Sequence, residues 1–311
     1  MNDSKQKVYY ILSLAIAIGL VFHGASFLST LEDTYDVYVH IFFGDHYSKS
    51  WFDPWEYRWY TGFGLTSYPP LLHQLIGLVS FLNGLKFATY ILCFGIVVLY
   101  VTGSFRFSKL ITGNAESAGY ASLIAVFLPS VIEAFHVFGQ LPMMLGISWL
   151  LHALPEINKY IRTGKLRYYV AAISLIAVAV CSHHVTPIFG MVFFVLPLMG
   201  TAIMDASHEE LGSYKAIKFS HFFKYFKKYF SRIAGFGFST IFITIFVILP
   251  YWLWSKNDPI TQVPIPHGSR DSFIESFSSG LVFFIIPWGF LVLMFPFFFY
   301  RYFSKSTTSL F

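Results

Sequence analysis

Residues 70–84 read PLLHQLIGLVSFLNG, and the topology of the chain depends on whether this segment crosses a membrane. The chain of 311 residues is 56% hydrophobic and only 12% charged, with a mean hydropathy of +0.60. A soluble protein has roughly a quarter of its residues charged, so the composition predicts a polytopic membrane protein. The segment 70–84 is shorter than the about 20 residues that cross the hydrocarbon core, and it fits either a short span or a helix at the membrane surface.

Other apolar segments approach the length of a membrane span. We predict eight helical spans, at residues 8–28, 87–105, 118–135, 138–154, 168–184, 186–204, 233–254 and 280–300. The segments 138–154 and 168–184 are short, and prolines interrupt or kink several of the predicted helices. The predicted fold class is therefore all-α and polytopic, with about eight transmembrane helices and an external juxtamembrane helix, in a single integral membrane domain covering 1–311.

The distribution of charge decides the position of residues 70–84. If this segment stays outside, 16 of the 21 Lys and Arg residues lie on one side of the membrane, and ten of the 16 acidic residues lie on the other. Basic loops face the cytoplasm. A span at 70–84 would reverse the predicted orientation of every later span and place Arg106 and Lys109 outside. We therefore predict an external helix at 70–84, with both termini cytoplasmic.

The same rule explains the basic balance of the chain. A net charge of +5 and a pI of about 9.0 suggest an anionic partner, but the excess Lys and Arg belong to the cytoplasmic loops, so we expect no nucleic-acid binding. Cys93 and Cys181 lie in apolar runs and supply neither a disulfide framework nor a Cys-based metal site. The N-terminal apolar run lacks a clear cleavage site, which favours a retained signal anchor. We expect a prokaryotic plasma membrane as its location.

Three segments outside the predicted spans carry most of the polar residues. The first external segment, 29–86, begins with a loop, 29–69, that contains six acidic residues, two histidines and three tryptophans. The second external loop is 255–279. On the cytoplasmic side, the linker 205–232 has a phenylalanine stripe opposite several lysines, which indicates an amphipathic helix on anionic lipid. Membrane lipids are therefore expected partners.

Asp36 and His40 are candidates for chemistry in the first external loop. They are four residues apart, so they share one face if residues 34–43 form a helix, with Asp33 beside them. A carboxylate at this position can act as general base on an acceptor hydroxyl, and Asp33, Asp36 and His40 together can bind a divalent cation. The alternative is a solvated acidic helix end in which His40 only packs.

Other polar residues on the outer side supply further candidates. His183 and His184 follow a span, and Glu133 lies near the outer end of another; ionisable groups in such places usually face a polar cavity rather than lipid. An acid–base or phosphate-binding role for His183 and His184 is weighed against a merely interfacial one. His23 and His152, isolated in apolar stretches, are better explained as hydrogen-bonded contacts between helices.

External arginines and aromatic residues complete the set. Arg58 and Arg270 can clamp a phosphate through two parallel hydrogen bonds, which lysine does less well. For each arginine, the alternative is a cation at the membrane surface among Trp and Tyr side chains. The aromatic residues of the loop, including Trp55 and Tyr68, can provide the flat apolar walls that hold a sugar ring.

The order of these motifs resembles a known superfamily. A first span is followed by an Asp-x-x-x-His motif (Asp36 to His40), by tryptophans and glycines, and by the external helix that begins at Tyr68-Pro69-Pro70-Leu71. Over about residues 8–190, this order is similar to the start of the polytopic GT-C glycosyltransferases, and most closely to YfhO-like and 6-pyruvoyl-tetrahydropterin-synthase-related membrane proteins. Members of that superfamily are generally longer, so the chain fits a minimal member, a fragment or one subunit.

The resemblance implies a transferase that passes a sugar from a polyprenyl-phosphate-linked donor to an acceptor on the outer face. It implies that Asp36 is the base, that Asp33 assists it or binds metal, and that Arg58 and Arg270 bind the donor phosphate. The residues implied to line the rest of the site are His40, His183, His184, Tyr68, Trp55 and Glu133.

Two functions of other classes also fit the sequence. The chain can be a non-enzymatic subunit that binds lipid or scaffolds a larger membrane complex, with its external carboxylates merely solvated. It can also be a redox subunit that binds haem between histidines at matched depth, for which His136, His183 and His184 qualify.

Overall fold

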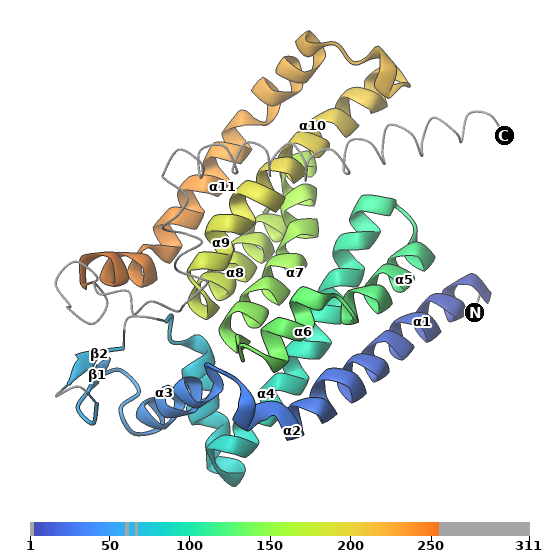
Figure 1. Cartoon of the computed structure of the whole chain (residues 1–311). Coiled ribbons are helices and arrows are strands. Elements are labelled where there is room, and N and C mark those ends of the chain that lie inside the picture. The colour runs from blue at the N-terminus through green and yellow to red at the C-terminus, as the bar shows by residue number, and fades with distance from the viewer. Residues whose placement is uncertain (1–2, 60–61, 66–67, 255–311) are drawn as a thin grey trace, which may run out of the picture. The chain divides into compact units, whose positions relative to one another are not determined.

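The computed structural model describes residues 3–59, 62–65 and 68–254 (Figure 1). These residues are helical apart from short connections and two antiparallel two-residue strands, β1 (Trp55–Glu56) and β2 (Phe63–Gly64). The predicted all-α class is confirmed for this part of the chain. The predicted span 280–300, the loop 255–279 and Arg270 lie outside the described residues.

Most helices follow one another with short connections, whereas residues 50–70 separate α3 from α4. The α-helices are α1 (Asp3–Gly19), α2 (Ser26–Thr30), α3 (Val37–Lys49), α4 (Leu71–Thr112), α5 (Ala115–Val126), α6 (Pro129–His136), α7 (Leu141–Thr163), α8 (Leu166–Ser182), α9 (Val185–Gly190), α10 (Leu196–Leu211) and α11 (Phe219–Trp254). Two π-helical segments, η1 (Leu20–Ala25) and η3 (Met191–Val195), and two 3₁₀ turns, η2 (Leu31–Asp33) and η4 (Tyr214–Ala216), join some of them.

Four helical segments in the described ranges are long and apolar enough to cross a membrane. They are Lys5–Asp33, Leu71–Thr112, Met191–Leu211 and Phe219–Val247. A fifth span results if α5 and α6, which meet at an angle of 47°, are one broken span. The described residues therefore support a membrane protein with four or five spans, and the prediction of eight is not confirmed.

Length and charge explain why two predicted spans fall short. For the predicted span 168–184, the structure has α8, which contains 17 residues and is about 26 Å long at 1.5 Å per residue, less than the hydrocarbon core of about 30 Å. For 138–154, it has α7, which continues to Thr163 with charged residues and Pro155 in its second half. Neither helix is among the four segments that are long and apolar enough to cross a membrane.

Helix α4 consists of two helices that meet at residues 83 and 84. Asn83 has φ −159° and ψ 35°, and Gly84 has φ 81° and ψ 173°, a conformation that requires glycine. The break separates residues 71–82 from residues 85–112, close to the boundary predicted between the external helix and the next span. The side of the membrane on which 71–82 lies stays a prediction.

The chain forms two compact units. The first comprises Met1–Pro155 and Ala171–Pro187, and the second comprises Glu156–Val170 and Ile188–Phe311. All described candidate site residues belong to the first unit. In this unit α1 contacts α4 and α5, and α3 contacts α4 (Figure 1).

A polar contact joins the first span to the bend between α5 and α6. His23 lies in the π-helical segment η1, is 1% exposed, and its Nε2 is 2.7 Å from the carbonyl oxygen of Val126. Helix α5 ends at Val126, so this carbonyl has no donor from a following turn of the helix, and the histidine supplies one. His152 similarly contacts Thr102 and the carbonyl of Leu99. Both histidines are hydrogen-bonded helix contacts, as predicted.

In the second unit, α10 and α11 are joined near the segment predicted to be an amphipathic linker. The side chains of Lys224 and Tyr225 both contact the carboxylate of Glu210, at 2.6 Å each. Phe219 is 80% exposed beside exposed lysines. The residues 205–232 are therefore mostly helical, and their position at a lipid surface stays a prediction.

Candidate functional site

Helix α3 packs on the first half of α4 through two glycines. A Cβ atom on Gly77 would lie 3.0 Å from the carbonyl oxygen of Gly44 and 2.9 Å from the backbone nitrogen of Ser48. A Cβ atom on Gly44 would lie 2.4 Å from a methyl carbon of Ile76. Only glycine permits this backbone approach, which brings the side chains of α3 against those of α4.

A small hydrophobic core holds the loop that follows α3 to this helix. Its buried members are Phe43, Tyr47, Phe63 and Leu65. Partly buried side chains pack against it, namely Val39, Phe42 and Tyr68. The many aromatic residues of the segment thus build a local core as well as an exposed surface.

Asp36 lies directly after the first candidate span and directly before α3. Its backbone N–H donates to the carbonyl of Phe138 at 3.0 Å, and its carboxylate accepts a hydrogen bond from Nε2 of Gln140 at 2.7 Å. The connection between α6 and α7 therefore holds Asp36 through both backbone and side chain. The helix predicted for 34–43 begins only at Val37, because this pairing keeps the preceding residues extended or in a turn.

His40, on the first turn of α3, contacts a second histidine that the sequence analysis did not select. Its Nδ1 is 3.1 Å from Nε2 of His73 on α4, and the two rings are 0% and 1% exposed. The ring of Tyr68 packs edge-on against His40, with 5.1 Å between ring centroids. Burial lowers the pKa of His40 well below its usual value, and the proximity of His73 and His183 lowers it further. His40 is therefore a neutral imidazole at pH 7.

His183 has a defined tautomer through its neighbour Thr186. The backbone N–H of Thr186 donates to Nδ1 of His183 at 3.2 Å, and the Thr186 hydroxyl oxygen is 2.8 Å from the same nitrogen. Nδ1 is thus an acceptor, and the proton of the neutral ring is on Nε2. His184 is half-buried, with 5.6 Å between its ring centroid and that of His183. His183 lies close enough to His40 to lower the pKa of His40.

Two predicted site residues lie exposed. Asp33 ends the 3₁₀ turn Leu31–Asp33, and Glu133 is on α6. Within the described ranges, no group of three or more His, Cys, Asp or Glu residues could hold a metal ion. The structure therefore does not group Asp33, Asp36 and His40 around a common point, because the His40 ring contacts His73 on α4 while Asp33 remains at the surface.

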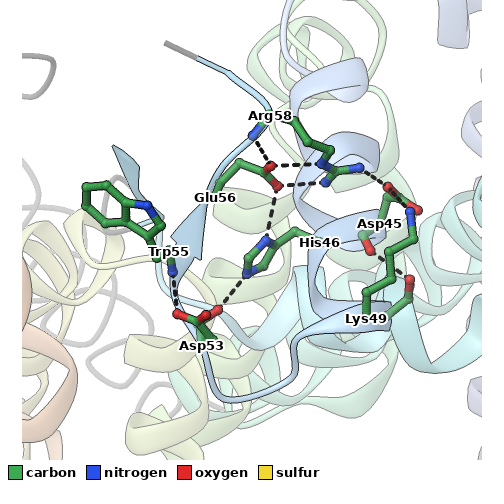
Figure 2. A network of polar contacts seen from close by, with 8 residues as sticks. Asp45, His46, Lys49, Asp53, Trp55, Glu56 and Arg58 are labelled. Atoms are coloured by element: carbon green, nitrogen blue, oxygen red, sulfur yellow. Dashed lines mark hydrogen bonds and ion pairs between the residues drawn. The ribbon is translucent and has the colours of Figure 1, made fainter. Parts of the chain in front are cut away.

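Arg58 belongs to a polar network at the other end of α3, shown in Figure 2. Its guanidinium donates to both carboxylate oxygens of Glu56, at 2.8 and 2.6 Å, and also to Asp45. Glu56 in turn contacts Nδ1 of His46 at 3.0 Å, and Asp45 contacts Lys49 at 2.7 Å. The guanidinium fork is thus engaged by carboxylates of this chain, so the geometry does not support Arg58 as a phosphate clamp.

Trp55 lies at the edge of this network. Its backbone N–H donates to the carboxylate of Asp53 at 2.9 Å, and the backbone carbonyl of Asp53 is 2.6 Å from Nε2 of His46 (Figure 2). The indole of Trp55 lies next to Gly62 and is partly exposed. The network fixes the loop that carries the aromatic residues, which is a structural role.

We expect the Glu56–Arg58 pair to stabilise this loop in a pH-dependent way. The hydrogen bonds from Arg58 lower the pKa of Glu56 from 4.5 to about 2, against the opposing effect of burial. The stabilisation, about 3 kcal/mol, is fully present above pH ~4.5 and is lost as the pH falls toward ~2. Thermal unfolding of wild type and Glu56→Gln should differ most near pH 7 and converge in acid.

The control for this prediction is Lys49→Gln. Lys49 contacts Asp45 in the same network but is 64% exposed, so its loss should change stability by less than ~1 kcal/mol. A wild-type advantage over Glu56→Gln that stays constant from pH 7 to pH 3 would contradict the prediction.

Comparison of the chain with protein-family models, curated proteins and solved structures finds no match. The resemblance to GT-C glycosyltransferases therefore stays a prediction from the residues of the first half of the chain. The geometry around Asp36 and His40 is the basis for proposing a function.

Proposed function

We propose that the protein transfers a sugar from a polyprenyl-phosphate-linked donor to an acceptor hydroxyl at the outer face of the membrane. The observation that carries this proposal is the position of Asp36. Its carboxylate lies where the first candidate span, Lys5–Asp33, has just ended and α3 is about to begin. A donor whose lipid tail lies in the membrane presents its phosphate and sugar at that level.

Asp36 is proposed as the general base. As the acceptor oxygen forms a bond to the anomeric carbon, its proton passes to the Asp36 carboxylate. The bond between the anomeric carbon and the phosphate oxygen breaks, and its electron pair leaves with the polyprenyl phosphate. Positioned proton transfer of this kind contributes about 10²–10⁴-fold to a rate. The hydrogen bond from Gln140 holds the carboxylate in place.

The surroundings of Asp36 suit a polar, uncharged acceptor. His40 is neutral and buried, and the half-buried ring of Tyr68 covers it. A neutral imidazole therefore lies on the first turn of the helix that Asp36 precedes. This supports a role for His40, His183 and Tyr68 on the acceptor side, as the resemblance implies.

A donor-consumption assay tests the proposal. Purified protein in lipid nanodiscs is incubated with undecaprenyl- and dolichyl-phosphate-linked glucose or mannose and with an alkyl glucoside as acceptor. We expect release of polyprenyl phosphate and a product heavier by one hexose, both detected by mass spectrometry. Nanodiscs without protein give the background. Donors that remain intact across this panel would contradict the proposal and favour the non-enzymatic alternative.

A further inference from the structure

Positive charge is concentrated at the beginning of α11. Between Leu211 and Trp254 the sequence contains six Lys and Arg residues and no Asp or Glu. The last of the six is Arg232, so they all lie in the first turns of α11 or in the connection before it. The same helix supplies the candidate membrane span Phe219–Val247. The charged end is therefore part of a helix that is apolar enough to enter a membrane.

Contacts within the second unit fix the rotation of α11 about its axis. Tyr225 and Tyr229 are buried, and the hydroxyl of Tyr225 donates to the carboxylate of Glu210 on α10 at 2.6 Å. The guanidinium of Arg232 donates to the backbone carbonyl of Ile161 on α7, also at 2.6 Å. One face of the helix therefore packs on the protein itself, and this determines which residues the other faces present.

A second face of α11 carries a strip of phenylalanines. Phe219, Phe223 and Phe230 are 80%, 56% and 55% exposed. The half-buried ring of Phe226 connects them, with 6.3, 6.2 and 5.8 Å between successive ring centroids. Residues three and four apart are neighbours on the surface of a helix, so the four rings form one continuous apolar strip.

Two lysines lie beside the phenylalanine strip. Lys227 and Lys228 are exposed, and Lys227 follows Phe223 by four residues, which makes the two side chains neighbours. Nζ of Lys228 is 5.4 and 5.6 Å from the ring centroids of Tyr225 and Tyr229. Neither lysine forms an ion pair with another residue in the part of the chain that the structure describes. Their charge is therefore available to an anion from outside the chain.

The length of the candidate span places this region at the surface of a bilayer. Its 29 residues extend about 44 Å at 1.5 Å per residue. The hydrocarbon core is about 30 Å thick, and the bilayer with its headgroups about 40–45 Å. A helix longer than the core is accommodated by tilting. The first residues of the span therefore lie at the level of the headgroups, and the tilt turns one of their faces toward the acyl chains.

We propose that residues 219–232 of α11 bind anionic phospholipids of the membrane in which the helix lies. The phenylalanine strip contacts the acyl chains, and Lys227 and Lys228 contact the phosphates. A helix face of large apolar residues bordered by lysines binds at the boundary between headgroups and acyl chains. A lysine there extends its ammonium group to the phosphates while its methylene stem stays on apolar surface.

The continuation of α11 favours lipid over a protein as the occupant of this strip. Phe238 and Phe242, further along the candidate span, are exposed as well. A bilayer covers both groups of phenylalanines at once, whereas a protein partner at the beginning of the helix would leave the later ones to be covered separately. The positive charge beside the strip selects anionic lipids among the lipids of the bilayer. This inference is independent of the proposed sugar transfer, which involves no residue of 219–232.

Photo-crosslinking at Phe223 tests what covers the strip. Phe223 is replaced by p-benzoylphenylalanine in the full-length protein, which is placed in nanodiscs of phosphatidylglycerol and phosphatidylcholine in equal amounts. After irradiation, mass spectrometry identifies the adducts. We expect adducts with lipid, mainly with phosphatidylglycerol. An adduct with a second copy of the chain or another protein in place of lipid, or adducts in equal yield with the two lipids, would overturn the proposal.

Removal of the two lysines tests the preference for anionic lipid. In the variant Lys227→Gln/Lys228→Gln, we expect the ratio of phosphatidylglycerol to phosphatidylcholine adducts to fall by about fivefold for each lysine removed. The control is Lys49→Gln/Lys86→Gln, which removes the same charge from two exposed lysines of the first unit. The control should keep the wild-type ratio. An unchanged ratio in the first variant, or an equal fall in the control, would overturn the role of the two lysines.

Spin labels on two faces of α11 test its orientation. Phe223→Cys and Ser220→Cys, each in a chain with Cys93→Ala and Cys181→Ala, are labelled in nanodiscs, and thermal unfolding confirms that each variant is folded. We expect oxygen, which dissolves in lipid, to reach the label at residue 223, and a water-soluble nickel complex to reach the label at residue 220. A label at residue 223 that is accessible mainly to nickel, or shielded from both reagents, would overturn the proposal.

Discussion

Replacement of Asp36 by Asn is expected to slow sugar transfer by about 10²–10⁴-fold without unfolding the protein. The substitution removes the proposed base and changes the size of the side chain very little. The amide oxygen of Asn can still accept the hydrogen bond that Gln140 donates to Asp36, and the backbone bond from residue 36 to Phe138 is unaffected. The rate of polyprenyl-phosphate release from the lipid-linked donor measures the effect.

The matched control is Glu32→Gln, an exposed carboxylate four residues earlier. Its ion pair with Lys86 lies at the surface, where such pairs contribute about 0–1 kcal/mol. We expect near wild-type transfer for this variant. Equal activity of Asp36→Asn and wild type would remove the base from the mechanism. A thermal transition of Asp36→Asn close to that of wild type is needed to interpret its loss of activity.

Replacement of Gly77 by Val is expected to produce the largest loss of stability. The new side chain would meet the backbone of α3 at Gly44 and Ser48, and backbone atoms cannot rotate aside as a flexible side chain can. Overpacking typically costs 1–3 kcal/mol and occasionally more, and here it also separates the helices that bring His40 to His73. Thermal unfolding should show the lower stability, and histidine NMR should show a disrupted pair.

Gly95→Ala, in the second of the two helices that make up α4, is the control. Nothing lies within 4 Å of the position that its Cβ would occupy, and alanine is favoured over glycine inside a helix by up to about 1 kcal/mol. We therefore expect equal or slightly higher stability. If Gly77→Val were as stable as Gly95→Ala, the close contact between α3 and α4 would not be what holds residues 29–86 together.

The helices were largely predictable because their apolar length is visible in the sequence. The Asn83-Gly84 break lies close to the boundary predicted between the helix at 70–84 and the next span. The number of membrane spans was not predictable from the sequence. Apolar runs such as 138–154 look like spans in isolation, and only the structure shows that the helix continues into a charged half.

The candidate site was predicted in part. Asp36 and His40 were chosen for a shared helix face, but the structure starts the helix after Asp36 and turns His40 to His73, 33 residues later in the chain. A partner so far along the chain leaves no periodic pattern in the sequence from which the contact could be predicted. The sequence does not reveal that carboxylates engage Arg58, because Glu56 and Asp45 contact it together only when the loop folds back on α3.

The π-helical segment in the first span determines the direction in which the following residues leave it. Successive residues of an α-helix are rotated by about 100°, and a π-helical segment corresponds to one inserted residue. Removing one residue from Leu20–Ala25 would restore a regular helix and rotate everything after it, including Asp36, by about that angle. In related sequences, the length of this segment should therefore be held constant, whereas surface loops are free to gain or lose residues.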